Sequence, residues 1–106
     1  MDVIERIKSQ LSSNPVLLYM KGTPDFPQCG FSAAAVRALT AAGASFGTVN
    51  IFEDPELREA LKRYSNWPTY PQLYVNGELI GGSDIIMEMD ASGELAKVLG
   101  EATTSA

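Results

Sequence analysis

The sequence predicts an α/β fold, a mixed four-stranded sheet flanked by helices on both faces. Three observations lead to this prediction. Residues 16–20 form a continuous apolar run of strand length, as expected for a strand buried on both faces. A helical segment separates this run from a second strand at residues 45–51, and the order strand, helix, strand implies a parallel pair with a right-handed crossover. Asn76-Gly77 between two short strand-like runs favours a tight antiparallel hairpin.

The first two helices are predicted by apolar spacing and by their ends. Residues 1–14 place their apolar side chains on one face, and Asp2 is the expected N-cap. An alanine-rich segment after Cys29 suits a second helix that ends near Ala42-Gly43. The first helix therefore leads into the first strand, and the second connects the two parallel strands.

The remaining helices follow the second strand. Asp54-Pro55 opens one of them, because aspartate caps a helix and proline fits its first turn. Residues 65–71 contain two prolines and must form an irregular loop before the hairpin. Another helix is expected to start at Gly82-Ser83-Asp84, and a last short one carries residues 95–99.

These elements divide into a β-α-β half and a β-β-α half. Together with the leading helix, they give the layout of a thioredoxin-like fold. At 106 residues and 45% hydrophobic content, the chain suits one core rather than two. We therefore expect a single domain over residues 1–106, with a leading helix at 1–14 and a frayed tail at 101–106.

The composition limits the kinds of partner that this chain is expected to bind. Acidic residues outnumber basic ones by 13 to 8, which gives a formal net charge of -5, and the basic residues are scattered. Nucleic acid is therefore not an expected partner. No apolar run approaches the ~20 residues that span a bilayer, and the N-terminus lacks the layout of a signal peptide, so no membrane association is expected. The expected location is cytoplasmic, where a lone thiol stays reduced.

Cys29 is the only cysteine, and the chain has no histidine. It lies in Pro27-Gln28-Cys29-Gly30-Phe31-Ser32 between a strand and a helix, so its thiol is expected at the first turn of that helix. Free N–H groups and the helix dipole stabilise a thiolate there. Ser32 stands where a Cys-x-x-Cys motif has its second sulfur, so no disulfide can close within the chain. This context outweighs the common interpretation of a lone cysteine as a buried, inert side chain.

Four segments resemble the monothiol glutaredoxins of the Cys-Gly-Phe-Ser type. They occur in the family's order and spacing, and the resemblance runs from Ile4 to Leu99 and matches the single-domain, bacterial-like form. The segments are Met20-Lys21-Gly22, Pro27-Gln28-Cys29-Gly30-Phe31-Ser32, Asn66-Trp67-Pro68-Thr69-Tyr70-Pro71-Gln72-Leu73 and Gly77-Glu78-Leu79-Ile80-Gly81-Gly82-Ser83-Asp84-Ile85.

The resemblance implies a glutathione site around Cys29 as the catalytic thiol, with Pro71 as a cis-proline. Glutathione carries two carboxylates and one ammonium. Cations and the N–H groups at a helix start would bind the carboxylates, and the Asp84 carboxylate would bind the ammonium. The Tyr70 backbone would pair with the cysteinyl backbone of glutathione. The implied binding residues are Lys21, Cys29, Phe31, Arg58, Lys62, Thr69, Tyr70, Pro71, Gly82, Ser83 and Asp84.

The resemblance also implies a 2Fe-2S cluster that bridges a homodimer, with Cys29 as the metal ligand. The ligand count agrees, because a 2Fe-2S cluster takes four thiolates and two chains with two glutathiones supply four. Many relatives carry cysteine where this chain has Ser83, so a disulfide between the two loops is also out of reach. The implied role is iron-sulfur cluster assembly, transfer and iron homeostasis, with a BolA-like protein and recipient apo iron-sulfur proteins as partners.

Several residues also have a structural interpretation. Lys21 could be a strand-end lysine reaching to solvent, and Arg58 a solvated charge on a helix face. Asp84, with the serine before it, could merely cap its helix. Phe31 either shields the thiolate from water or fills space. Trp67 is expected to pack under the proline-rich loop, with no chemical role.

The alternative function is enzymatic. In a glutathione-dependent thiol-disulfide oxidoreductase, Cys29 would attack a glutathionylated substrate and a second glutathione would regenerate it. The loop at residues 22–27, bulkier than in dithiol relatives, favours the cluster carrier, because it would misplace glutathione for transfer while leaving its sulfur free for iron. A Cys-x5-Arg phosphatase or arsenate reductase is excluded, because position 35 is Ala. A zinc site within one chain lacks ligands, and an inert interaction module would require a dispensable Cys29.

Overall fold

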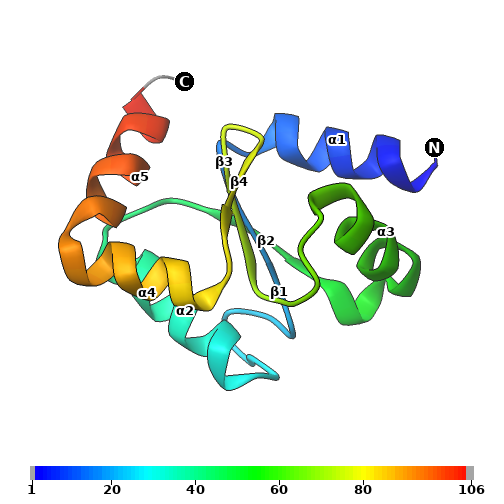
Figure 1. Ribbon diagram of the computed structural model, residues 1–106, viewed down its shortest axis with the longest axis horizontal. Coiled ribbons are helices and arrows are strands. Elements are labelled where there is room, and N and C mark those ends of the chain that lie inside the picture. The colour runs from blue at the N-terminus through cyan, green and yellow to red at the C-terminus, as the bar shows by residue number, and fades with distance from the viewer. Residues whose placement is uncertain (1, 105–106) are drawn as a thin grey trace.

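The protein is described by a computed structural model that covers residues 2–104. Its strands are β1 (Val16–Met20), β2 (Gly47–Asn50), β3 (Gln72–Val75) and β4 (Glu78–Gly81). They form one sheet in the order β2-β1-β3-β4 (Figure 1). β1 runs parallel to β2 and antiparallel to β3, and β4 is antiparallel to β3. The predicted mixed sheet and thioredoxin-like fold are therefore confirmed.

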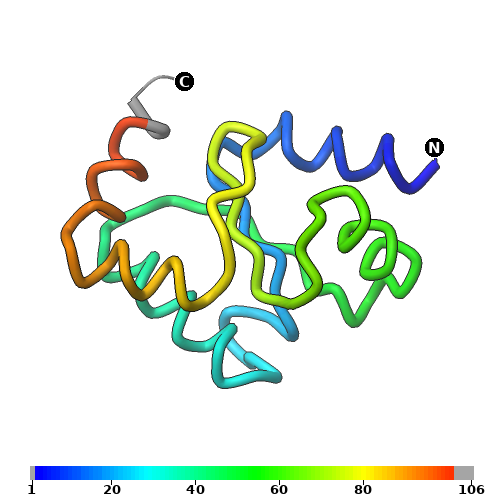
Figure 2. The backbone as a smooth tube through the Cα atoms, in the orientation of Figure 1, coloured from blue at the N-terminus to red at the C-terminus, as the bar shows by residue number. Residues whose placement is uncertain are grey.

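Helices cover both faces of this sheet. Figures 1 and 2 show α1 and α3 on one side of the strands and α2 and α4 on the other, with α5 continuing from the end of α4. A short 3-10 turn, η1, connects β2 to α3. The bounds are α1 (Val3–Ser13), α2 (Gly30–Ala41), η1 (Ile51–Glu53), α3 (Pro55–Ser65), α4 (Ser83–Ser92) and α5 (Glu94–Thr104).

Each face of the sheet has its own apolar core, and β1 contributes to both. Leu18 and Met20 pack with the α2, α4 and α5 side, while Leu17 and Tyr19 pack with the α1 and α3 side. This alternation follows from the two-residue period of a strand. Because β1 is buried along its whole length, it holds the start of the segment that leads to Cys29 in place.

The predicted caps and hairpin turn are present. Asp2 Oδ1 accepts a hydrogen bond from the Glu5 N–H at 2.9 Å, and Asp54 Oδ1 accepts one from the Leu57 N–H at 3.2 Å. Both bonds satisfy amides that have no partner within their helix. Between β3 and β4, Asn76 and Gly77 have φ of 51° and 80°, as a two-residue primed turn requires.

Two boundaries differ from the prediction. The second strand was expected to span residues 45–51, but β2 ends at Asn50. The Asn50 side chain accepts hydrogen bonds from the N–H groups of Phe52 and Gly22, both at 3.0 Å, and so turns the chain into η1. The last helix was expected to be short and to carry residues 95–99, but α5 continues to Thr104; positions 105–106 of the expected frayed tail lie outside the described residues.

The lengths and compositions of the helices bear on whether the chain could span a membrane. None of the helices in residues 2–104 is long and apolar enough to cross a bilayer.

Candidate functional site

Cys29 lies where the chain passes from β1 to α2. It is the N-cap residue of α2, with extended backbone angles of φ −153° and ψ 136°, and its thiol is free and partly exposed. Because α2 begins at Gly30, the amides of its first turn lie next to the sulfur and have no acceptor within the helix. The thiol therefore occupies the position expected from the sequence.

The surroundings of Cys29 lower its pKa below the usual thiol value. The backbone N–H of Ser32 contributes most, desolvation opposes it, and the Phe31 N–H, the Lys21 charge and the Ser32 hydroxyl add smaller effects that also lower the pKa. Cys29 forms no capping hydrogen bond, so these amides act as nearby dipoles. Since the thiolate is the nucleophilic and metal-binding form, the site favours the reactive state of the sulfur.

Ser32 replaces the second thiol of a dithiol site with a structural contact. Its side chain is fully buried, and its Oγ accepts a hydrogen bond from the Lys21 N–H at 3.1 Å. This bond connects the end of β1 to the first turn of α2. The hydroxyl thus holds together the two elements that carry Cys29.

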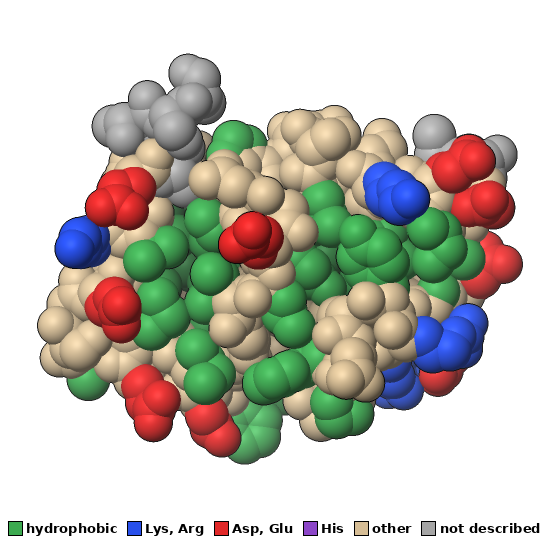
Figure 3. All heavy atoms as spheres, turned by 45° about the horizontal axis from the view of Figure 1, so that its top comes forward, with side chains coloured by type: hydrophobic (Ala, Val, Ile, Leu, Met, Phe, Trp, Pro, Cys, Tyr) green, Lys and Arg blue, Asp and Glu red, His purple; other side chains and the backbone are tan. Residues whose placement is uncertain are grey.

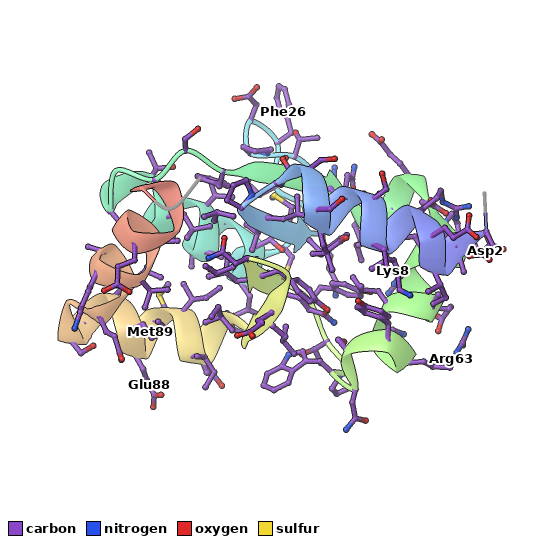
Figure 4. The ribbon with its side chains drawn as sticks, turned by 90° about the horizontal axis from the view of Figure 1, so that it is seen from above. Asp2, Lys8, Phe26, Arg63, Glu88 and Met89 are labelled. Atoms are coloured by element: carbon purple, nitrogen blue, oxygen red, sulfur yellow. The ribbon has the colours of Figure 1, made fainter. Side chains whose placement is uncertain are left out.

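A tight loop, residues 21–28, brings the chain from β1 to Cys29. The Gln28 N–H donates to the Lys21 carbonyl at 2.9 Å, and Thr23 and Phe26 exchange backbone hydrogen bonds of 3.3 and 3.1 Å. The tip carries Phe26, which is 76% exposed and points away from the body of the protein (Figure 4). The loop is therefore internally bonded and presents an aromatic ring to solvent close to the thiol in the chain.

A pocket of about 320 Å³ opens beside Cys29. Its walls come from the end of β1, the start of α2, the loop before β3 and the start of α4, which are far apart in the sequence. The volume is near the lower end of the roughly 300–1,000 Å³ typical of small-molecule sites. The lining residues are Lys21, Cys29, Phe31, Trp67, Thr69, Tyr70, Gly82, Ser83 and Asp84.

The loop before β3 is fixed by its own polar contacts. The peptide between Tyr70 and Pro71 is cis, as the family resemblance implied. The side-chain amide of the fully buried Gln72 donates to the carbonyls of Trp67 and Thr69, both at 3.1 Å. Pro71 is buried and is not among the lining residues, so it shapes the pocket through the position of Tyr70.

Two of the predicted cations, Arg58 and Lys62, lie on α3 outside the pocket lining. The Arg58 guanidinium lies over the Phe52 ring, with Cζ 5.6 Å from the ring centroid. Lys62 Nζ pairs with Glu59 Oε1 at 3.3 Å. Among the lining residues of the described structure, Lys21 is the one that carries a positive charge.

The start of α4 forms another wall of the pocket. Gly82 is the N-cap, and no side chain caps this helix. A cap formed by Asp84 together with Ser83, which the sequence allowed, is therefore wrong, because both residues already lie within the helix. The first amides of α4 stay available for an acceptor in the pocket, and the exposed Asp84 carboxylate lies beside them.

Trp67 is a lining residue that the sequence interpretation missed. Its indole Nε1 is buried and has no hydrogen-bond partner among the described residues. A Cβ added to Gly82 would lie 3.0 Å from this nitrogen, so the indole packs directly against the Gly82 backbone. The available signal was its place in the proline-rich loop, next to residues already assigned to the site.

Two other pockets of the described structure have no cysteine in their lining. One of about 440 Å³ lies between α1, α3 and the hairpin turn and includes Lys8 and Tyr64, and one of about 270 Å³ lies between α2 and α4. Over residues 2–104, no group of three or more cysteine, aspartate, glutamate or histidine side chains could hold a metal ion. The pocket beside Cys29 is therefore the candidate functional site.

The fold and this pocket define the class of the protein. A thioredoxin-like sheet, a free thiol at the start of a helix, a cis-proline loop and a serine in place of a second cysteine are the parts of a monothiol thioredoxin-fold protein. Comparison with known proteins narrows this class to a family.

The glutaredoxin family profile matches residues 16–80. Glutaredoxin 4 of Haemophilus ducreyi is 54% identical over 98% of this chain and 97% of its own length. Monothiol glutaredoxin-S11 of rice is 58% identical over 92% of this chain, which spans 20% of that longer protein. The solution structure of reduced poplar apo GrxS14 superposes with a TM-score of 0.84 at 47% identity, over 96% of this chain and 94% of that one. The chain therefore belongs to the glutaredoxin family, and its Cys-Gly-Phe-Ser sequence places it among the monothiol members.

Proposed function

We propose that this chain binds glutathione beside Cys29 and, as a homodimer, carries a bridging 2Fe-2S cluster in iron-sulfur cluster assembly, transfer and iron homeostasis. One observation carries the proposal: a partly exposed cysteine with a lowered pKa adjoins a pocket in a chain that has no second thiol. Such a thiolate can bind iron or attack a disulfide, but it needs sulfur from outside to complete either task.

The charges of the pocket fit glutathione. The Lys21 ammonium suits one carboxylate, and the free amides at the start of α4 suit the γ-glutamyl carboxylate. The Asp84 carboxylate suits the ammonium group. The backbone of Tyr70 would pair with the cysteinyl part of the ligand. Arg58 and Lys62 lie outside the lining, and in this proposal they turn from Phe52 and Glu59 to reach the glycyl carboxylate.

The donor set fits a cluster shared between copies. A 2Fe-2S cluster takes four thiolates, whereas this chain has one cysteine and, within its described residues, no other group of metal ligands. Two copies and two glutathiones supply the missing sulfur. Cys29 Sγ would hold the cluster as cargo, and the 64% exposure of the neighbouring Phe31 leaves this face open to a second copy.

Anaerobic reconstitution with iron, sulfide and glutathione tests the proposal. The wild-type protein should gain visible absorption, while Cys29→Ser should stay colourless and bind almost no iron. Circular dichroism of the variant should match the wild type, since a partly exposed thiol adds little to the core. Equal iron and colour in both proteins would show that Cys29 is dispensable for cluster binding and would contradict the proposal.

The lowered pKa of Cys29 also favours the alternative, glutathione-dependent thiol-disulfide exchange. The Cys29 thiolate would attack the glutathione sulfur of a glutathionylated substrate, release the substrate thiolate and form a mixed disulfide with glutathione. A second glutathione thiolate would then release oxidised glutathione and restore Cys29. We expect slow turnover with a glutathionylated peptide, because the internally bonded loop at residues 22–27 would misplace glutathione for transfer. Turnover equal to that of a dithiol glutaredoxin would favour the enzyme.

The partners and location belong to the same proposal. We expect a BolA-like protein and apo iron-sulfur proteins to receive or share the cluster, in the cytoplasm, where the thiol stays reduced. Transfer to an apo-ferredoxin, followed by its circular dichroism in the visible range, is the direct assay for the recipient role. Failure of the holo-protein to deliver cluster would remove this part of the proposal.

A further inference from the structure

The indole of Trp67 carries an unexplained polar group. Its Nε1 is buried without a partner within residues 2–104, although almost all buried donors in proteins are hydrogen-bonded. An unpaired buried N–H destabilises the structure that contains it, so a native example calls for an explanation. The same indole lines the pocket beside Cys29, where a bound ligand could supply the missing acceptor.

Trp67 is held so that the indole cannot easily turn toward water. Its backbone N–H donates to the Lys62 carbonyl at 3.2 Å, and its carbonyl accepts from the Gln72 side chain at 3.1 Å. The preceding Asn66 ends α3 in the left-handed conformation, with φ of 54°. The backbone of the residue is therefore held on both sides, and the indole packs against the Gly82 backbone.

The indole also borders the place where a carboxylate would sit. Gly82 and Ser83, at the start of α4, line the pocket together with Trp67. No side chain caps α4, so its first amides have no side-chain acceptor, and Asp84 is the acidic residue of this first turn. A carboxylate bound there would be the nearest strong acceptor for the indole N–H.

We propose that Trp67 is a glutathione-binding residue whose Nε1–H donates a hydrogen bond to the γ-glutamyl α-carboxylate held at the start of α4. The inference rests on the proposed function and adds a residue to its site. Because the Gly82 backbone packs against the nitrogen in the free protein, the proposal requires the Gly82–Ser83 turn to shift locally when glutathione binds. The bond then satisfies the donor that is unpaired in the free protein.

Calorimetric titration with reduced glutathione tests the proposal on the full chain under anaerobic conditions. Trp67→Phe keeps a flat aromatic wall and removes the N–H, so its dissociation constant should rise about tenfold, equivalent to ~1.4 kcal/mol. The free variant should unfold at the same temperature as the wild type or higher, because it loses an unpaired buried donor. A merely structural indole would lower the unfolding temperature and leave the dissociation constant of glutathione unchanged.

A matched ligand isolates the carboxylate. γ-Aminobutyryl-cysteinyl-glycine lacks the γ-glutamyl α-carboxylate, so the wild type and Trp67→Phe should bind it equally. Equal binding of glutathione by both proteins would overturn the inference, as would an equal loss with both ligands. If the wild type binds no glutathione at all, the proposed function fails first, which separates the two failures.

A second readout needs no variant. Trp67 is the only tryptophan, so its indole N–H gives one resolvable signal in a nitrogen-15 correlation spectrum. Glutathione should move this signal downfield and slow its hydrogen exchange, and the analogue should do neither. An indole signal that stays in place while backbone amides of Ser83 and Asp84 shift would contradict the proposal.

Discussion

At the scale of single residues, the acidity of Cys29 comes mainly from the main chain. The N–H of Ser32 is the largest influence on its pKa, and the charge of Lys21 ranks below the Phe31 N–H. Main-chain dipoles at a helix start are fixed by the fold, whereas a lysine on a long flexible chain is screened by water. The thiolate should therefore survive the loss of the lysine.

The pKa of Cys29 with and without Lys21 can be measured from the rate of iodoacetamide alkylation as a function of pH. The rate should rise with pH through a midpoint below the usual thiol value, because the folded protein favours the thiolate. In Lys21→Met the midpoint should move up only part of the way toward that value. A return to the full value for a free thiol would show that the cation, not the amides, controls the pKa.

The lowered pKa also has a consequence for stability. The pKa of Cys29 is lower in the folded protein than in the unfolded chain. Ionisation of the thiol therefore adds stability as the pH rises from the folded pKa to the unfolded pKa, and it adds none below the folded pKa. Urea unfolding of the wild type relative to Cys29→Ser should show this rise with pH. A difference that is flat or falls over that interval would contradict the direction of the shift.

At the scale of elements, the loop from β1 to α2 depends on Gly22. Its φ is +91°, and an added Cβ would lie 2.5 Å from the Phe26 carbonyl oxygen and 2.7 Å from the Gln28 backbone nitrogen. Both contacts are with backbone, so neither atom can move without opening the loop. The segment that delivers Cys29 to its position thus tolerates glycine alone at this point.

Gly22→Ala should lower the free energy of unfolding by about 2–3 kcal/mol, from the left-handed strain and the clash together. The matched control is Gly43→Ala, where φ is +78° but no atom lies within 4 Å of an added Cβ. It should cost only the strain, about 1 kcal/mol. Urea unfolding of both variants gives the comparison, and equal losses would mean that the loop adjusts to the methyl group.

The elements themselves could be read from the sequence where the signal is local. Asp2 and Asp54 act through amides three residues away, and Asn76-Gly77 sets its own turn, so each was predictable. The end of β2 was not, because the Asn50 side chain bonds to Gly22, which is distant in the chain. Boundaries set by tertiary contacts leave no periodic trace in a sequence.

The same distinction holds for the site. Cys29 and Tyr70 were predictable from their motifs, and both line the pocket. Arg58 is outside the lining because its long side chain packs on Phe52, a partner that no spacing rule indicates. Trp67 was expected only to pack under its loop, because its neighbour Gly82 lies 15 positions further along and meets it only in the folded protein.

At the scale of the whole molecule, the shortage of metal ligands indicates that other molecules complete the site. Figure 3 shows acidic side chains at both ends of the visible face, while most of the visible lysines and arginines lie over α1 and α3. The thiol lies at the carboxyl end of β1 with open space beside it and no second metal ligand group in the described residues. A function that needs more than one sulfur must therefore use other molecules.

Native mass spectrometry of the anaerobically reconstituted protein tests this central claim most directly. The account predicts one species of two chains, two glutathiones and one 2Fe-2S cluster, which separates into colourless monomers when glutathione is removed. A cluster on a single chain, or a coloured dimer that persists without glutathione, would contradict it.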